Sequence, residues 1–358
     1  MSLRIAFLIP TLDPGGAERQ LVNTVRALAE HDIHIAVFVM RDAHTLSPQL
    51  PDTVQLEVIG IKGKGSFGEF RRLFNKISAF KPDVLHGQLY PGNLIARLYR
   101  LTRPKTKVVN HIHGLGGWMK PWNIWGERLT GWLADRILTV SQRSYDIRRR
   151  REGYSLKRLA VQYNAIDTRR FDGPLPAAQP PLIFGMAARL IPLKRVDRVI
   201  RLIGALRERG LDAQLYIAGD GPERANLDAL VEELQLSQAI HFQGLVSEMP
   251  AFYQSIHVLC LASETEDLPM VLIEAMASGR PFIASDVGGI SELTAEGIGL
   301  LVPDWEAADF PDQVHDFIAS VDWEACWKHN REVAQTQFDE RAYAQRLLEM
   351  YRGFFIDN

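Results

Sequence analysis

The stretch Val258–Ser285, VLCLASETEDLPMVLIEAMASGRPFIAS, contains the repeating unit from which the fold is derived. It begins and ends with short apolar runs, and between them lie a polar loop and a helix predicted over 271–277. Pro269 suits the first turn of this helix, where no donor hydrogen is needed, and Gly279 suits its end. Two buried strands joined through a helix predict a parallel strand pair.

The same alternation of apolar runs and helical patterns continues along the whole chain. In the first half, strands are predicted at 4–9, 33–40, 54–61, 83–86, 107–111, 136–140 and 159–163, and helices at 16–29, 70–79, 93–101, 123–133 and 142–151. In the second half, strands are predicted at 182–186, 213–217, 239–242, 258–261, 281–284 and 300–302, and helices at 196–208, 224–234, 271–277 and 312–320. The predicted fold class is therefore α/β, with two parallel-sheet domains that follow one another along the chain.

A change of charge marks the predicted domain boundary. Residues 1–172 carry 27 Lys and Arg against 15 Asp and Glu, whereas residues 173–358 carry 14 against 28. The change falls at 173–181, GPLPAAQPP, which has the composition of a linker. We predict a basic domain at 1–172, a second domain at 182–337 and a helical tail at 338–358. A basic domain suits anionic membranes, phosphorylated acceptors or nucleic acid.

The composition indicates a cytoplasmic protein. The apolar stretch at 5–9 is too short for the core of a secretion signal, and no apolar run approaches the roughly 20 residues that span a bilayer. The two cysteines, Cys260 and Cys326, are far apart and predict neither a disulfide framework nor a metal pair.

The segment Gly63–Gly68, GKGSFG, matches the dinucleotide-binding fingerprint in its letters only. It follows the third predicted strand instead of the first, and the acidic residue expected about 20 residues later, Asp83, begins a strand. We interpret it as a glycine-rich loop in which Lys62 and Lys64 help to hold an acceptor. The sequence contains neither a P-loop signature nor an Asp-x-Asp pair, so we predict no bound metal and no resident cofactor.

The start of the helix after residue 261 is the strongest candidate for a ligand site. Its free backbone N–H groups and positive dipole end suit a diphosphate. The predicted contacts come from the first turn of the helix, Pro269, Met270, Val271 and Leu272. Glu274 follows among apolar neighbours, where a carboxylate needs a specific donor, and a ribose diol would supply two hydroxyl groups.

A second cluster follows the first strand of the same half. Arg189 lies at the carboxyl edge of the predicted sheet, and Lys194 lies at the start of the next helix. Two cations there can neutralise the charge that grows on a departing diphosphate, which is work otherwise done by Mg²⁺.

Taken in order, these motifs resemble one known family. The matching pieces are Gly15-Gly16-Ala-Glu18, Asp83-Val-Leu-His86, His113-Gly114, Val140-Ser141, Asn164-Ala-Ile-Asp167, Arg189 with Lys194, Gly219-Asp-Gly-Pro222 and the pair Glu266 and Glu274. The set is similar to the retaining glycosyltransferases of family 4, and it spans nearly the whole chain. The resemblance implies the GT-B fold, an α/β fold with two Rossmann-like parallel-sheet domains facing across a cleft.

The resemblance implies roles for these residues. Arg189 and Lys194 would bind the diphosphate of a nucleotide sugar, with Glu274 on the ribose and Glu266 on the donor sugar. Arg189, Lys194 and Glu266 thereby join the catalytic set. The tail at 338–358 would pack back on the first domain.

In the first half, the resemblance implies that the loop at Gly15 and Gly16 closes near the donor phosphates. His113 would lie beside the donor sugar as a catalytic residue, with His111 as the competitor. Both histidines point to the same face of a strand, and His113 is favoured because it ends the strand before Gly114.

The chain departs from the family at positions where glycine or Gly-Phe is common. It has Ala188 and Arg195 in place of glycine, and Asp267-Leu268 in place of Gly-Phe. Arg195 either adds a third phosphate contact or faces solvent, and Asp267 affects which sugar is accepted.

The expected function is a retaining, metal-independent hexosyltransferase that uses a UDP- or GDP-sugar. The expected acceptor is a glycan or a lipid-linked glycan in polysaccharide or lipopolysaccharide synthesis. His86 and Trp118, with Lys62 and Lys64, are the candidate acceptor contacts. The tryptophans at 118–132 and the basic residues Arg148–Arg151, Lys157 and Arg158 predict peripheral contact with the inner membrane face.

Other functions stay open at this point. A nucleotide-sugar epimerase or a phosphorylase-like enzyme can use the same architecture, and a silent donor-binding subunit would keep the same site. A nucleic-acid-binding protein would explain the basic half but not the cluster of Arg189, Lys194 and Glu274, and no nucleic-acid-binding motif occurs.

Overall fold

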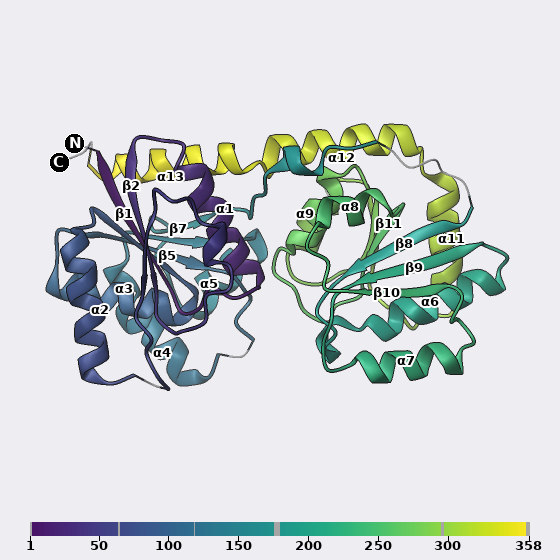
Figure 1. Cartoon of the computed structure of the whole chain (residues 1–358), viewed down its shortest axis with the longest axis horizontal. Helices are drawn as coiled ribbons and strands as arrows, with labels where there is room; N and C mark the ends of the chain where they lie inside the picture. The colour runs from purple at the N-terminus through teal and green to yellow at the C-terminus, as the bar shows by residue number, and fades with distance from the viewer. Residues whose placement is uncertain (1, 64, 118, 175–179, 295–296, 356–358) are drawn as a thin grey trace. The chain divides into compact units, whose positions relative to one another are not determined.

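The computed structural model describes residues 2–63, 65–117, 119–174, 180–294 and 297–355 (Figure 1). The chain divides into two compact units. Unit 1 comprises residues 1–166 together with 340–358, and unit 2 comprises residues 167–339. The boundary falls at 166/167, a few residues before the predicted one, and most of the predicted linker lies outside the described residues.

Unit 1 is built on a parallel sheet of seven strands in the order β3-β2-β1-β4-β5-β6-β7. The strands are β1 (Leu3–Ile9), β2 (Ile33–Val39), β3 (Gln55–Val58), β4 (Val84–Gln88), β5 (Lys107–Ile112), β6 (Arg136–Thr139) and β7 (Leu159–Val161). The helices are α1 (Gly16–Leu28), α2 (Phe67–Phe80), α3 (Leu89–Thr102), α4 (Pro121–Thr130), α5 (Gln142–Arg151) and α13 (Glu340–Gly353), with short 3-10 turns η1 (Ser47–Gln49) and η2 (Gly131–Leu133).

Unit 2 is built on a parallel sheet of six strands in the order β10-β9-β8-β11-β12-β13. The strands are β8 (Leu182–Ala187), β9 (Ala213–Ala218), β10 (Ile240–Gly244), β11 (Val258–Leu261), β12 (Phe282–Ser285) and β13 (Gly299–Val302). The helices are α6 (Val196–Glu208), α7 (Arg224–Glu233), α8 (Met249–Gln254), α9 (Met270–Ala277), α10 (Ile290–Thr294), α11 (Phe310–Ser320) and α12 (Trp323–Gln337), with 3-10 turns η3 (Thr168–Phe171) and η4 (Pro192–Lys194).

The predicted α/β class with two parallel sheets is confirmed, and every predicted strand is present. Three helices were not predicted, namely α8, α10 and α12. The single helix predicted at 123–133 is instead α4 followed by the short turn η2. No helix within the described ranges is both long and apolar enough to cross a membrane.

Helices cover both faces of the unit 1 sheet. On one face, Phe7 and Val37 of the sheet pack with α1 and with Tyr343 and Leu347 of α13. On the other face, α2 and α3 pack against the sheet. Figure 1 shows α13 beside α1. The end of the chain is therefore part of the core of unit 1.

In unit 2, α6, α7 and α11 pack on one face of the sheet, and Figure 1 shows α8 and α9 on the opposite face. Helix α9 is almost wholly buried and contacts α12. It ends at Ala277, and the predicted Gly279 follows the cap residue Ser278. The N–H of Gly279 donates to Met276 O, and the N–H of Arg280 donates to Ala275 O. Gly279 has φ +73°, and a Cβ there would lie 2.2 Å from the Trp327 ring, so glycine is required.

Candidate active site

The loop that follows β8 carries both predicted phosphate-binding cations. Arg189 is exposed just after the strand, and Lys194 is half-buried at the end of η4. Across the residues that the structure describes, no side chain pairs with the guanidinium of Arg189. Both residues lie at the carboxyl edge of the parallel sheet, where open α/β folds bind ligands.

The glycine motif at 219–222 packs against the backbone of this loop. A Cβ on Gly219 would lie 1.8 Å from Ala188 O, and a Cβ on Gly221 would lie 2.4 Å from Leu190 O. The N–H of Leu190 donates to Asp220 O at 2.9 Å. These two glycines therefore let the turn after β9 pack directly against the backbone beside Arg189.

Lys194 contacts the loop between β11 and α9. Its ammonium Nζ lies 2.5 Å from the Glu266 carboxylate Oε1, and Glu264 N–H donates to Leu193 O at 2.9 Å. The next loop along the edge packs against the same residues, because a Cβ on Gly288 would lie 1.8 Å from Glu266 O. The structure thus brings together two clusters that are 72 residues apart in the chain.

Arg195 pairs with acidic side chains and does not simply face solvent. Its guanidinium is held by Asp197 at 2.9 Å and by Glu264 at 3.1 Å, and these acidic partners raise its pKa. Its backbone adopts the left-handed conformation with φ 47°, which glycine takes up more readily than other residues. Arg195 therefore ties together the two loops that carry Lys194 and Glu266.

Glu274 lies in α9 with only 7% of its surface exposed. One carboxylate oxygen, Oε2, accepts a hydrogen bond of 2.7 Å from the hydroxyl group of Tyr253, a fully buried residue of α8. The Tyr253 ring packs edge-on against Phe171. Tyr253 was not predicted, and only the Met249-Pro250 start of a helix signals its element in the sequence.

The start of α9 differs by one residue from the prediction. Pro269 is the cap residue in an extended conformation, and the helix begins at Met270. Its first residues Met270, Val271 and Leu272 follow the loop that carries Glu266. The N–H of Leu272 donates to Pro269 O at 3.2 Å, and the earlier N–H groups of a first helical turn are suited to an anion.

In unit 1, Gly15 and Gly16 lie at the start of α1, at the carboxyl edge of the sheet. A Cβ on Gly15 would lie 2.3 Å from Glu18 Oε2, whereas a Cβ on Gly16 would meet nothing within 4 Å. Burial raises the pKa of Glu18, whose other oxygen accepts from the Thr11 hydroxyl at 3.3 Å. Gly15 therefore leaves room for the Glu18 carboxylate, whereas the space beside Gly16 is open.

Three histidines form a column at the ends of β4 and β5, which we call the histidine column. Their ring centroids are 5.6 Å apart between His86 and His111, and 4.1 Å apart between His111 and His113. His113 is partly exposed, and its Nε2 lies 2.6 Å from Gln88 Oε1. His111 is buried, so the geometry favours His113 as the ligand contact.

Two of the four predicted acceptor residues, His86 and Lys62, lie within the described residues. His86 has no exposed surface, and its Nδ1 lies 2.5 Å from the Tyr351 hydroxyl of α13, which does not fit contact with an acceptor. Lys62 is exposed, and its backbone N–H donates to Glu69. Lys64 and Trp118 lie outside the described residues. Within the described ranges, no group of three His, Cys, Asp or Glu side chains could hold a metal ion.

The histidine column predicts loss of stability in mild acid. Burial lowers the pKa of His86 and His113 to about 3, and that of His111 well below its usual value. Between these values and about 6.5 the unfolded chain binds more protons than the folded chain, so stability falls as the pH falls through this window. For each fully buried histidine, the free energy of unfolding should be about 2 kcal/mol lower at pH 5 than at pH 7.

Urea unfolding of the whole chain at pH 7 and pH 5 measures this difference. The variant His111→Gln should show a smaller loss on acidification than the wild type. The matched substitution of the surface residue His315, His315→Gln, should keep the full loss. Equal losses in all three proteins would contradict the neutral column.

Both units thus carry parallel sheets whose loop edges hold the candidate residues, which is the architecture of the GT-B glycosyltransferases. The structure is similar to that of HepE from Anabaena in complex with UDP, with a TM-score of 0.84 at 20% identity, covering 98% of this chain and 100% of that one. It is equally similar to a glycosyltransferase from Rickettsia africae, with a TM-score of 0.84 at 17% identity over 100% of both chains.

Sequence comparison identifies the family within this class. Residues 14–170 match the model of Glycosyltransferase Family 4, and residues 167–332 match that of Glycosyl transferases group 1. The chain therefore belongs to the group 1 glycosyltransferases of family 4 and is a glycosyltransferase.

The sequence identity to individual curated relatives is low. The chain is 30% identical to the alpha-D-kanosaminyltransferase of Streptomyces kanamyceticus, over 53% of each chain. It is 25% identical to the putative glycosyltransferase EpsD of Bacillus subtilis, over 80% of each. It is 29% identical to an N-acetyl-D-galactosaminyltransferase of Campylobacter jejuni named for a PP-undecaprenol-linked glycan, over 76% of this chain and 77% of that one.

Proposed function

We propose that the protein transfers a hexose from a UDP- or GDP-sugar to a glycan or lipid-linked acceptor, with retention of the anomeric configuration. The observation that carries this proposal is the ion pair of Lys194 with Glu266, in the loop that leads into α9, the helix that carries Glu274. Cations, a helix start and a held carboxylate are the groups that a diphosphate and a ribose require. The solved complexes of HepE with UDP and with UDP-glucose support the choice of donor class.

In this proposal each group has one task on the donor. Arg189 and Lys194 bind the diphosphate together with the first turn of α9. Glu274 accepts hydrogen bonds from the two ribose hydroxyl groups, and Tyr253 holds its carboxylate in place for this. Glu266 contacts the donor sugar. Lys194 and Glu266 are paired with each other. In the bound complex, the diphosphate therefore lies at Lys194 and the donor sugar lies at Glu266.

The chemical step then needs stabilisation of the leaving group. The bond between the anomeric carbon and the diphosphate oxygen breaks while the acceptor oxygen bonds to the same face of the sugar. The acceptor proton passes to a phosphate oxygen of the leaving group. Lys194 and Arg189 stabilise the negative charge that collects on the diphosphate, which is the task a divalent metal performs in other enzymes, and we therefore propose a metal-independent reaction.

We assign the acceptor side, and further contacts to the donor, to residues of unit 1. His113 accepts a hydrogen bond from the donor sugar through Nδ1, since its Nε2 faces the Gln88 amide oxygen and so carries the proton. Gly15 and Gly16 allow a close approach of backbone to the phosphates. Lys62 remains an acceptor contact in this proposal, whereas His86 is omitted because it is buried.

The biological setting we propose is polysaccharide or lipopolysaccharide synthesis at the inner face of the cell membrane. Its support is the excess of basic residues in the first half of the chain, together with the lipid-linked glycan in the name of the Campylobacter relative.

Product analysis tests this proposal. The protein is incubated with UDP- and GDP-hexoses, with and without EDTA, and with short glycan and polyprenyl-diphosphate-glycan acceptors. We expect transfer in EDTA and an NMR coupling constant that shows the donor's anomeric configuration in the product. An inverted product would contradict retention. Conversion of the donor sugar without an acceptor would show an epimerase instead.

A further inference from the structure

Helix α4 and the turn η2 expose a line of large apolar side chains. Trp122, Trp125, Leu129 and Trp132 are each between 60% and 68% exposed. Their spacing of three, four and three residues places them along one helical face. Leu156, in the neighbouring loop, is 55% exposed. We call these five residues the tryptophan stripe. Exposed apolar patches of this kind are rare on soluble proteins unless they bind something.

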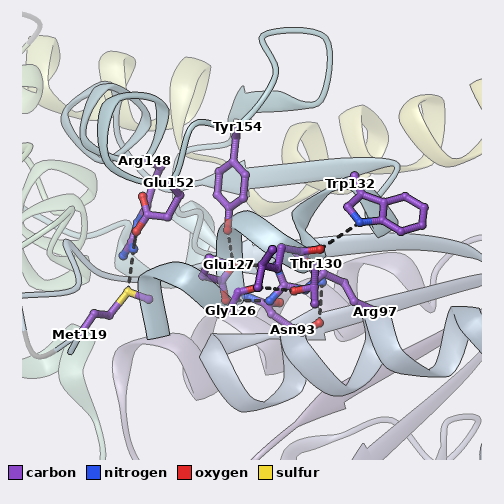
Figure 2. Close-up of polar contacts among 12 residues, drawn as sticks. Asn93, Arg97, Met119, Gly126, Glu127, Thr130, Trp132, Arg148, Glu152 and Tyr154 are labelled. Carbon is purple, nitrogen blue, oxygen red and sulfur yellow. Dashed lines mark hydrogen bonds and ion pairs between the residues drawn. The ribbon is translucent and has the colours of Figure 1, made fainter. Parts of the chain in front are cut away.

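The opposite face of α4 is held in the core of unit 1 by a buried ion cluster. Glu127 accepts from both terminal nitrogens of the fully buried Arg97 of α3, at 2.6 and 2.7 Å. The hydroxyl group of Tyr154 also donates to Glu127, as Figure 2 shows. Breaking such a buried pair leaves an uncompensated charge, so α4 cannot roll to cover its tryptophans. The exposure of the stripe is therefore fixed by the packing beneath it.

The surroundings of the stripe are strongly basic. Residues 120–158 contain ten Lys and Arg but only four Asp and Glu. Two of these acids, Glu127 and Glu152, are buried in ion pairs and present no charge to the surface. Lys120 and Arg128 lie over the rings of Trp122 and Trp125, at 5.0 and 5.7 Å from the ring centres. The stripe thus combines aromatic rings with positive charge.

Two of the arginines predicted for this surface have another task. Arg148 is buried, donates to Gly114 O at 2.6 Å and pairs with Glu152, and Figure 2 shows it reaching Met119. Arg151 donates to Gly116 O at 3.1 Å. These two side chains hold the loop that joins His113 to α4, so we do not count them with the exposed positive charge around the stripe. The exposed basic residues are Arg149, Arg150, Lys157 and their neighbours.

We propose that the tryptophan stripe inserts into the interface of an anionic lipid bilayer, with α4 lying along the membrane plane. Tryptophan and leucine beside Lys and Arg are the composition of interfacial helices, since the rings settle at the headgroup level and the cations bind anionic lipids. A second copy of this chain is disfavoured as the occupant because two such basic surfaces repel each other. This inference rests on the proposed function only for its lipid-linked acceptor.

Vesicle binding tests the stripe. The full-length protein is sedimented with vesicles of phosphatidylglycerol and phosphatidylcholine, and with vesicles of phosphatidylcholine alone. The wild type should bind the anionic vesicles in a salt-sensitive manner. The double variant Trp125→Ser, Leu129→Ser should lose about tenfold or more in partitioning, since two large side chains no longer leave water. Leu245→Ser, which removes a leucine that is 84% exposed in unit 2, is the matched control and should bind as the wild type does.

Three outcomes would overturn the inference. One is equal binding of the double variant and the wild type while both keep the same melting temperature. Another is a lack of tryptophan quenching by lipids brominated in the upper acyl chain. The third is a dimer in sedimentation equilibrium that dissociates in the double variant, which would identify a second copy as the occupant. Transfer to a water-soluble acceptor is measured in parallel, so that a failure of membrane binding is distinguished from a failure of the proposed reaction.

Discussion

Replacement of Glu274 by alanine should lower kcat/KM for the donor by at least about 100-fold. The carboxylate is proposed to accept from two ribose hydroxyl groups, and each hydrogen bond to a charged group contributes about 1.5–3 kcal/mol. Most of the loss should appear in KM, because the ribose does not change during the reaction. Initial rates over a range of donor concentrations measure it.

Two further substitutions make this prediction specific to the donor. Glu274→Gln keeps the shape of the side chain but removes its charge, and it should retain more activity than Glu274→Ala. Tyr253→Phe removes the hydroxyl group that holds Oε2 and should raise KM several-fold with kcat nearly unchanged. Wild-type rates for Glu274→Ala at sub-saturating donor would remove the carboxylate from the donor site.

Lys194→Ala should reduce kcat by about 10²–10³-fold, because it removes a group aimed at charge that develops on the leaving diphosphate. The ammonium group is also the ion partner of Glu266, so the variant disturbs the sugar contact at the same time. Lys194→Arg should recover part of the rate by keeping the positive charge. Single-turnover rates at saturating donor isolate this effect from donor affinity.

Lys328→Ala is the matched control, since Lys328 also pairs with a glutamate in unit 2, Glu324, at 2.7 Å. That pair is exposed to solvent, and its loss should leave the rate unchanged. A rate for Lys194→Ala equal to that of Lys328→Ala would contradict the proposed role of Lys194 in the chemical step.

The strands could be predicted because their signal is local. Runs such as 258–261 are fully buried in a parallel sheet and read as unbroken apolar segments. The missed helices lack such a signal. Helix α12 buries only Cys326, Asn330, Val333 and Ala334 out of 15 residues, so its apolar stripe is narrow. Helices α8 and α10 have six and five residues, too few to show a helical period.

The site could be predicted only where one segment carries its chemistry. The cations after β8 and the glutamates around α9 stand out because charged residues follow buried strands directly. Tyr253 could not be found, since it reaches Glu274 from another helix across 21 residues. His86 appeared accessible at the end of a strand, but Tyr351, 265 residues further along the chain, covers it. Contacts of this range are set by the tertiary fold.

The direct test of the central claim is a crystal structure of the protein soaked with a non-hydrolysable UDP- or GDP-hexose. The diphosphate should lie at the first turn of α9 within hydrogen-bonding distance of Arg189 and Lys194, with the ribose hydroxyl groups on Glu274. A nucleotide bound elsewhere in unit 2, or a donor whose diphosphate touches neither cation, would contradict the assignment.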